Sequence, residues 1–395
     1  MMQKKFIPLS VPNLKGKELE YITQAIETEW VSSAGEYINQ FESQIAQYIK
    51  VKEAVACQSG TAGLHIALLS CGITKDMEVI VPALTFIASV NPVKYVGSEP
   101  VFMDCDDSLT MDPEKLRDFS ELECRFENEK LINNQTGKHV KAIIVVHIFG
   151  NMADMEKVMD IAVAFNLKVI EDAAEAMGTY YLSGRYAGKY AGSIGDVGVF
   201  SFNGNKIITT GGGGAIVSND LDLLRQSRHL TTQAKKDELY YEHDAIGYNY
   251  RMTNLQAAVG LAQLEQLETF IRIKKNNYDL YKLKIDSIPG LELLEYRENI
   301  RPNYWFYSLF CHEDYPLNRD KIIAFLDKRS IQARPIWGLI CDQKPYRENQ
   351  SYKIEKARRY VEHVVNLPCS SNLDKEDVLY VVKELTLRGR ACPNL

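Results

Sequence analysis

Three segments of the chain combine residue types that can hold a charged ligand and react with it. The first is Ser59, Gly60 and Thr61, which follow an apolar run and open a helical stretch. Free backbone N–H groups and the positive end of a helix dipole at such a place favour an anion, and the glycine lets a phosphate approach the backbone. Taken alone, the segment is more typical of a strand-to-helix turn with a serine or threonine cap.

The second and third segments supply an acid and a lysine. Asp172 ends the apolar run that begins at Lys168, and a buried carboxylate there needs a cationic or hydrogen-bonded partner such as the ring nitrogen of a ligand. A helix N-cap is the alternative interpretation of Asp172. Lys206 lies between an apolar run and the glycines 211–214, and confinement there favours the amine form that a Schiff base requires. The glycine run matches neither the dinucleotide-binding pattern nor the P-loop.

An anion site, a buried acid and a confined lysine together match the needs of pyridoxal 5′-phosphate (PLP). Its phosphate needs donors, its pyridine nitrogen needs a carboxylate, and its aldehyde needs a lysine. An aromatic side chain should also cover the ring, and Phe86 follows the second apolar run. A single aromatic residue is more often part of a core, so Phe86 depends on the other three groups for this interpretation.

Other polar residues point less clearly to a ligand. His147 ends an apolar run, where a hydrogen-bonded core histidine is the more common case. Asp104, Asp106 and Asp107 follow another run, but neither histidines nor the spacing of a calcium loop accompany them, and we expect no metal site.

Two arginines suit an anionic ligand. Arg251 follows two tyrosines and an asparagine in a long loop, where it could bind such a ligand or contact another subunit. Arg334 precedes Pro335 and Trp337, and a surface cation stacked on the indole is its alternative.

The elements that must position these residues alternate between short apolar runs and helical stretches. This alternation predicts βαβ units and an α/β fold with a mostly parallel sheet, whose ligands gather at the carboxyl ends of the strands. Two opening helices precede it. The runs expected as strands are 53–57, 78–81, 100–103, 141–147 and 167–170, with helices over 61–70 and 154–165.

The second half of the chain indicates a change of architecture. We expect a large α/β domain over 1–253, a linking helix over 254–285 and a small α+β domain over 286–395. The polar segment 121–139 is interpreted as a surface excursion. In the small domain the expected strands are 291–295, 304–311 and 331–334, and the expected helices are 321–328 and 375–387.

Composition excludes several classes of partner and location. The 46 Lys and Arg against 52 Asp and Glu give a net charge of −6, which argues against nucleic acid as a partner. The uncharged stretch 79–93 contains two prolines and is too short to span a membrane. The first ten residues lack the pattern of a secretory signal. The 8 scattered cysteines are typical of buried thiols, and we expect a cytoplasmic protein.

At these residues the sequence resembles the DegT/DnrJ/EryC1/StrS family of PLP-dependent sugar aminotransferases, which share the fold-type I architecture of aspartate aminotransferase. The resemblance covers the large domain and part of the small one. It rests on the segments 31–35, 59–61, 84–86, 171–175, 195–202, 247–252 and 334–337, together with Lys206.

The resemblance implies roles for individual residues. Lys206 would form the Schiff base, Asp172 would bind the pyridine nitrogen and Phe86 would stack on the ring. The phosphate would be held by Gly60, Thr61 and Ser201, with Asn249 reaching it from a neighbouring subunit, so a homodimer with shared active sites is implied. Glu175 stands where the family usually has glutamine near the 3-hydroxyl of the cofactor. Arg251 and Arg334 are expected to bind a diphosphate or a donor carboxylate.

The resemblance also implies a reaction. L-glutamate would donate its amino group, pyridoxamine phosphate would form in between, and the C4 ketone of a nucleotide-linked 4-keto-6-deoxyhexose would accept it for surface polysaccharide. The segments around Lys206 and Arg334 look most like the subgroup of the legionaminic acid pathway. Departures are Asn303-Tyr304-Trp305, where a Tyr-His pair is common, and the unbroken glycine run, which usually includes a glutamate.

Four alternatives remain open on the sequence. They are a 3-keto sugar aminotransferase, a PLP-dependent sugar dehydratase, a non-catalytic regulatory relative and a Rossmann dehydrogenase. The dehydratase subgroup carries histidine in place of the lysine, so Lys206 disfavours it. The chain lacks the glycine fingerprint of a Rossmann dehydrogenase, which disfavours that alternative.

Overall fold

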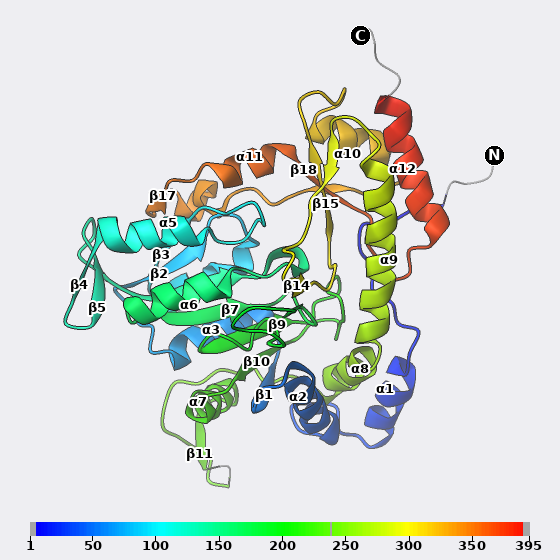
Figure 1. Cartoon of the computed structure of the whole chain (residues 1–395). Helices are drawn as coiled ribbons and strands as arrows, with labels where there is room; N and C mark the ends of the chain where they lie inside the picture. Colours follow the sequence, from blue (N-terminus) through cyan, green and yellow to red (C-terminus); the bar gives the residue numbers. More distant parts are fainter. Residues whose placement is uncertain (1–4, 238, 390–395) are drawn as a thin grey trace.

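The computed structural model describes residues 5–237 and 239–389. Its centre is a ten-stranded sheet with the strand order β1-β10-β9-β7-β6-β2-β3-β17, to which a further pair, β4 and β5, is attached through β6 (Figure 1). The strands of the main row are β1 (Glu53–Cys57), β2 (Met77–Pro82), β3 (Glu99–Met103), β6 (His139–Val146), β7 (Lys168–Asp172), β9 (Val197–Ser201), β10 (Gly214–Ser218) and β17 (Ser351–Tyr352).

The direction of the strands brings the predicted site residues to one edge. In the main row only β10 runs against its neighbours, so β1, β9, β7, β6, β2, β3 and β17 are parallel. Their middles are almost fully buried valine, isoleucine and alanine, as expected for a sheet covered on both faces. The predicted α/β class is confirmed, and the carboxyl ends of β1, β7 and β9 share one edge.

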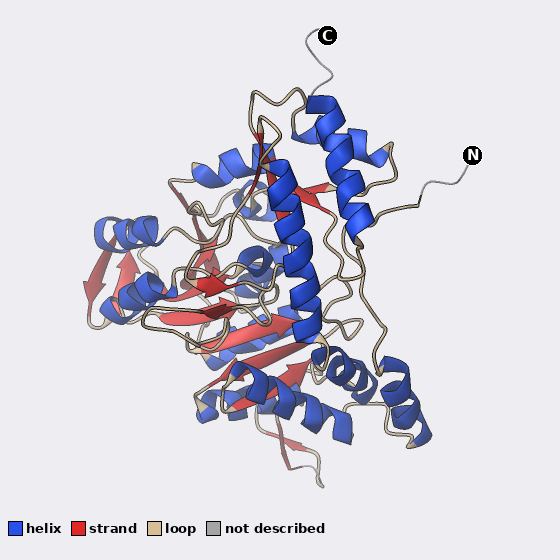
Figure 2. Cartoon of the chain, turned by 45° about the vertical axis from the view of Figure 1, so that its right-hand side comes forward, coloured by secondary structure: helices blue, strands red, loops and turns tan. Residues whose placement is uncertain are grey.

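Helices surround this sheet (Figure 2). The helix α3 (Gly60–Ser70) packs against β9 and β10 and is buried along most of its length, which explains its apolar sequence. The helix α6 (Met155–Ala164) is amphipathic and begins at Asp154, whose carboxylate accepts the Lys157 N–H at 3.3 Å. The other helices of this region are α1 (Glu18–Glu27), α2 (Glu36–Ile49), α4 (Asn91–Tyr95), α5 (Pro113–Asp118) and α7 (Leu221–Thr231).

The segment 121–139, interpreted as a surface excursion, contains two strands that the sequence did not predict. It folds into the antiparallel strands β4 (Cys124–Glu127) and β5 (Lys130–Asn133), and β5 pairs with the start of β6 through Leu131 and Val140. Leu131 and Asn133 are fully buried, whereas Lys130 is exposed. The alternation covers only four residues of mixed polarity, so its period of two was too short to be recognised.

The expected linking helix over 254–285 is two helices. The first, α8 (Asn254–Leu264), starts at a capping box formed by Thr253 and Gln256 and packs against α1 and α2. The second, α9 (Leu267–Ile285), packs against α12 and β13 of the small domain and runs along one side of the molecule (Figure 1). The chain bends between the two helices because each of them packs against different elements.

The C-terminal region contains a four-stranded sheet with the order β13-β15-β18-β16. The second expected strand starts late, at Tyr307, because Tyr304 has a φ of +57°. Of the expected strand 331–334 only its end forms β16, and β18 was not predicted. These strands are β13 (Leu291–Leu293), β15 (Tyr307–Cys311), β16 (Arg334–Pro335) and β18 (Val364–Leu367), with helices α10 (Arg319–Asp327), α11 (Lys356–His363) and α12 (Lys375–Gly389).

The chain crosses between the two regions more than once. The short strand β17, from the C-terminal third, joins the large sheet beside β3, and Ile7 forms a bridge with Ile331. A division at residues 253 and 286 therefore remains a proposal about two packing units that exchange segments.

Several negative findings apply to the described part of the chain. No helix there is both long and apolar enough to cross a membrane, and no cluster of three or more His, Cys, Asp or Glu side chains is arranged to hold a metal ion. The seven cysteines within it are buried free thiols, and Cys392 lies outside the described residues.

Candidate active site

A cavity of about 870 Å³ opens at the carboxyl edge of the large sheet, between this sheet and the segments 305–306 and 332–338. A volume of this size suits a cofactor together with a substrate. Of the residues predicted for the site, the structure brings Gly60, Thr61, Phe86, Asp172, Glu175, Ser201, Lys206 and Arg334 to its wall.

The turn from β1 into α3 forms one end of the cavity. The Ser59 hydroxyl accepts the Ala62 N–H at 3.1 Å and caps the helix, which leaves the N–H groups of Gly60 and Thr61 without an acceptor among the described residues. A side chain at position 60 would approach the Ser201 Cβ to 2.9 Å, so Gly60 is required by this contact with β9. Both interpretations of the segment are compatible: Ser59 is a cap, and the helix end is open to an anion.

Asp172 lies at the end of β7 with its carboxylate in the cavity wall and is 4% exposed. The Ser89 hydroxyl donates to Oδ2 at 2.6 Å and the Ala174 N–H donates to Oδ1 at 3.0 Å. Thr85 in turn lies 2.9 Å from Ser89, oxygen to oxygen. These neutral partners orient the carboxylate without neutralising it, which suits a cationic ring nitrogen.

The neighbouring acid, Glu171, has a purely internal role. It is fully buried on the other face of β7, where it accepts the Gly192 and Ile194 N–H groups at 2.8 and 2.6 Å. His147 Nε2 lies 2.8 Å from the same carboxylate, and its Nδ1 accepts the Ala153 N–H at 3.1 Å. The histidine is therefore a hydrogen-bonded core residue, as expected.

Glu175 and Lys206 meet inside the cavity. Lys206 Nζ lies 3.3 Å from Glu175 Oε1, and the Phe149 N–H donates to Glu175 Oε2 at 2.8 Å. Burial raises the pKa of Glu175, although the ammonium of Lys206 and the Phe149 N–H oppose that effect. The carboxyl group can thus both accept a hydrogen bond and, when protonated, donate one.

Phe86 forms an exposed part of the opposite wall. Half of its surface is accessible, and its ring lies 5.8 Å from that of Trp337, which in turn lies 4.9 Å from Phe149. The exposed ring is not a core residue and is available for stacking on a flat ligand.

Arg334 is placed at the rim on β16. Among the described residues no carboxylate or carbonyl is bonded to its guanidinium, and it is exposed. The nearby cavity residues Gln332 and Asn366 add uncharged polar groups. Such an unpaired cation beside a cavity suits an anionic substrate group.

Two predicted site residues are elsewhere. Arg251 forms an ion pair with Glu42 and donates to the Ala56 carbonyl at 3.2 Å, so its position does not support contact with a substrate in the cavity of its own chain. Asn249 is exposed and forms an isolated β-bridge with Thr232, outside the cavity. Its predicted contact with the phosphate of a neighbouring subunit stays a prediction.

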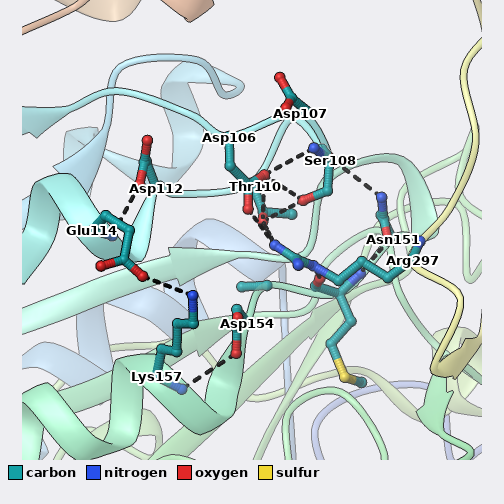
Figure 3. A network of polar contacts seen from close by, with 12 residues as sticks. Asp106, Asp107, Ser108, Thr110, Asp112, Glu114, Asn151, Asp154, Lys157 and Arg297 are labelled. Carbon is teal, nitrogen blue, oxygen red and sulfur yellow. Dashed lines mark hydrogen bonds and ion pairs between the residues drawn. The ribbon is translucent and has the colours of Figure 1, made fainter.

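The acidic segment after β3 binds the protein itself. Asp104 accepts the Lys115 ammonium at 2.7 Å and three N–H groups at the start of α11. Asp106 pairs with Arg297, which also donates to the Met152 carbonyl at 2.9 Å and reaches the loop before α6 (Figure 3). Asp104 and Asp106 thus connect elements that are distant along the chain, through Lys115 and Arg297.

Sequence reasoning missed two residues of the site. Ser89 orients Asp172 through a hydrogen bond. In the sequence, only Phe86 of the segment that contains Ser89 was predicted to take part in the site. Trp305 lines the cavity, and Lys206 Nζ lies 4.2 Å from the centre of its ring. The departure at Asn303-Tyr304-Trp305 was the available signal for Trp305, although it was interpreted only as a changed sugar contact.

The geometry fits PLP, with donors for a phosphate, an acid for the ring nitrogen and a lysine for the aldehyde in one cavity. Comparison with known proteins agrees. The model of the DegT/DnrJ/EryC1/StrS aminotransferase family matches residues 12–386. GDP-perosamine synthase of Escherichia coli O157:H7 is 38% identical over 382 residues, covering 96% of this chain and 98% of that protein.

Two further relatives extend this comparison. The UDP-4-amino-4,6-dideoxy-N-acetyl-beta-L-altrosamine transaminase of Campylobacter jejuni is 26% identical, with 95% of each chain covered. The crystal structure of DesI in the presence of its TDP-sugar product superimposes with a TM-score of 0.86 and 25% identity, covering 98% of this chain and 94% of that one. The chain thus belongs to the DegT/DnrJ/EryC1/StrS aminotransferase family and is a PLP-dependent sugar-nucleotide aminotransferase.

Proposed function

We propose that the protein transfers the amino group of L-glutamate to the C4 ketone of a nucleotide-linked 4-keto-6-deoxyhexose. The observation that supports this most is the position of Lys206, which shares one cavity with the Asp172 carboxylate, the free N–H groups of α3 and the unpaired Arg334. The first three groups serve the cofactor, and Arg334 is left for the substrate.

PLP, when bound, supplies an electron-accepting ring that stabilises negative charge on the carbon losing its proton. The proposed roles of the protein's groups follow from their chemistry. The N–H groups of Gly60 and Thr61 and the Ser201 hydroxyl bind the phosphate, and Phe86 covers the ring. Asp172 holds a proton on the ring nitrogen, because a carboxylate fixed by Ser89 favours the cationic form of its partner.

Lys206 has two proposed tasks. Its amine would hold the aldehyde of the cofactor, and as a free group Lys206 would move a proton to or from the substrate carbon as a general base and acid. Glu175, which touches Lys206 Nζ, lies near enough to receive or return that proton.

Arg334 is proposed to bind either the carboxylate of glutamate or the diphosphate of the nucleotide sugar. Both are anions that match a guanidinium, and they enter the site in different half-reactions. One cation at the rim therefore serves two substrates in turn. Arg251, which pairs with Glu42, is not assigned this task.

The proposal also specifies which sugar nucleotides are the first candidates for the substrate. The relative with 38% identity is named for a GDP-linked product, and the relative with 26% identity is named for a UDP-linked 4-amino sugar. A GDP-linked 4-keto-6-deoxyhexose is therefore the first substrate to test. The N-acetylated UDP-linked sugar of a legionaminic-type pathway is the second, and a 3-keto sugar is the third.

A second copy of the chain is proposed to complete the site. The two-stranded ribbon β11 (Lys235–Asp237) and β12 (Glu242–His243) projects from the body of the molecule (Figure 1). Exposed apolar residues lie on and beside it, with Leu239 at 75% and Ile246 at 86%. Asn249 follows on the same segment, so a partner that covers these residues would also receive Asn249 near its own cavity.

The decisive experiment incubates the purified protein with PLP, glutamate carrying labelled nitrogen, and a panel of 4-keto and 3-keto sugar nucleotides. We expect a labelled amino sugar by mass spectrometry and 2-oxoglutarate in equal amount, only when a 4-keto sugar is present. Amine formation from 3-keto sugars alone would overturn the position assigned to the ketone. A dehydrated sugar would indicate the dehydratase, and binding of PLP without any product would indicate the regulatory relative.

A further inference from the structure

Lys206 touches two side chains that are not among the groups expected to hold the cofactor's ring nitrogen and phosphate. On one side its Nζ lies 3.3 Å from Glu175 Oε1, and on another it lies 4.2 Å from the centre of the Trp305 ring. A carboxylate and an indole face are the two partners that bind an ammonium group most directly. Other charged groups facing the cavity are Asp172, which lies beside Glu175, and Arg334 at the rim.

Trp305 is fixed by its own hydrogen bonds and does not adapt to Lys206. Its indole Nε1 donates to the Asn205 carbonyl at 2.8 Å, so the ring is bound to the residue that precedes the lysine. Its backbone N–H donates to Asn303 Oδ1 at 2.9 Å, and its ring stacks on Phe306 at 4.0 Å. With 1% of its surface exposed, the side chain has no room to turn.

The same asparagine also holds Glu175. Asn303 Nδ2 donates to the carbonyl of Glu175 at 2.8 Å and to that of Met177 at 3.0 Å. The carboxylate and the indole that flank Lys206 are thus connected through one fully buried side chain. A side chain at position 150 would come within 1.9 Å of Asn303 Oδ1, so Gly150 leaves the space that Asn303 needs.

A buried lysine supports Trp305 from behind. Lys274 on α9 is 3% exposed and donates to the Trp305 carbonyl at 3.1 Å and to the Cys369 carbonyl. No carboxylate is bonded to it among the described residues, and burial lowers its pKa. Since burying an amine beside carbonyls alone is costly, this residue indicates that the backbone at Trp305 must be held in one place.

We propose that Trp305 and Glu175 form a holding site for the amine of Lys206, which keeps the lysine beside the reacting carbon during the part of the cycle when it is not bonded to the cofactor. Trp305 is a positioning residue in this site. The inference rests on the proposed function, because a transaminase leaves this lysine unbonded to the cofactor between its two half-reactions. It also gives Asn303-Tyr304-Trp305 a role, where the sequence showed only a departure from the family.

The test measures the reactivity of Lys206 and needs no sugar. The full-length protein is loaded with pyridoxamine 5′-phosphate, which forms no bond to the lysine, and treated with a trace of acetic anhydride. Acetylation of the Lys206 peptide is compared by mass spectrometry with that of exposed Lys15 in the same digest. Because an amine engaged by a carboxylate and an indole face reacts more slowly than a free one, we expect slow labelling of Lys206 in the natural sequence.

Three variants should release the lysine to different degrees. W305L removes the indole face and should raise the relative labelling of Lys206 by about fivefold or more. E175Q keeps the shape and the bond from the Phe149 N–H but removes the charge, and a rise of similar size is expected. W305F keeps an aromatic face and loses the bond to Asn205, so about a twofold rise is expected.

The matched control is W337L, which enlarges the same cavity at a ring that packs against Phe86 and Phe149. Its labelling ratio should equal that of the natural sequence. An equal rise in W337L would show that access alone matters and would overturn the proposal, as would unchanged labelling in both E175Q and W305F. E175Q keeps the size of the side chain and W305F keeps a buried aromatic ring, so the result does not depend on the folding of W305L. Failure to retain pyridoxamine phosphate would instead contradict the proposed function.

Discussion

Two acidic segments follow parallel strands at the same edge of the large sheet, and one is bonded within the protein whereas the other faces the cavity. After β3, Asp104 receives four donors from Lys115 and the start of α11. After β7, Asp172 receives two donors, both uncharged, and faces the cavity. The sequence presents both as acids that end an apolar run.

The difference lies in whether the protein itself satisfies the carboxylate. A buried carboxylate with several donors, one of them charged, is stable and has little capacity left for a ligand. A carboxylate with fewer, neutral donors retains free lone pairs and its charge, so a cationic ligand gains by binding there. Unsatisfied capacity, and not the mere presence of an acid, distinguishes the functional segment from the structural one.

Replacing the lysine should have the largest effect. In K206A we expect no transamination and no absorbance band of the cofactor bonded to a lysine, because Lys206 is the only lysine among the described residues that line the cavity. The control is K189A, at an exposed lysine, which should keep both properties. Visible spectroscopy and the mass-spectrometric assay check the result, and an active variant that retains the band would remove Lys206 from its role.

Asp172→Asn should come next. Loss of the negative charge beside the ring nitrogen is expected to lower kcat by about 100-fold or more, the size seen when a preorganised electrostatic group is removed. Because Ser89 and the Ala174 N–H can still bond to the amide, the urea midpoint should change little. Turnover close to normal would contradict the electronic role of Asp172.

Asp104→Asn should show the reverse pattern. The amide cannot accept from Lys115 and three N–H groups together, so we expect the free energy of unfolding to fall by about 2 kcal/mol, while kcat per folded molecule is kept. Burial alone would raise the pKa of Asp104, but its bonds to Lys115 and to the Glu355 and Ala357 N–H groups outweigh burial and lower it.

The sign of the pH dependence follows from that lowered pKa. A depressed carboxyl pKa stabilises the fold above its ordinary value of 3.8 and loses this contribution as the pH falls. The deficit of D104N should therefore be full near neutrality and shrink in acid. A deficit that is constant with pH, measured by urea unfolding, would contradict this account, and loss of kcat in D104N would remove the contrast with Asp172.

Glu175→Gln should have the smallest effect on stability, and of opposite sign. Burial raises the pKa of Glu175 above its ordinary value of 4.5, so its ionisation costs stability as the pH rises through the raised value. In cofactor-free protein the variant should match the natural sequence in acid and become the more stable of the two toward alkaline pH. Equal pH dependence of the two proteins in urea unfolding would show that Lys206 fully compensates the buried charge.

Much of the architecture was predictable because the strands of the large sheet are short apolar runs that can be recognised in the sequence. The runs at 53–57 and 100–103 are almost continuous apolar residues, and both are strands within one residue of the expected ends. The short strand β18 and the hairpin of β4 and β5 were missed, since strands of four residues carry too little pattern. The bend at 265–266 was missed because apolar periodicity continues through it, and only the packing partners change.

The sequence by itself determined the class of chemistry. Local patterns of strand, loop and helix identify Lys206, Asp172 and the turn at 59–61. The parallel order of the sheet then brings the strand ends that carry them together. It also determined the net charge of −6, because net charge is a sum over residues and does not depend on the fold.

Only the tertiary structure decided which of the similar residues are used. Asp104 and Asp172 look alike in the sequence, as do Arg251 and Arg334, yet in each pair one is bonded by the protein and the other faces the cavity. The partners of Asp104 at α11 lie far along the chain, at separations of 251 to 253 positions. Hydrogen-bond capacity is consumed by neighbours in space, and local sequence holds no information on contacts at that distance along the chain.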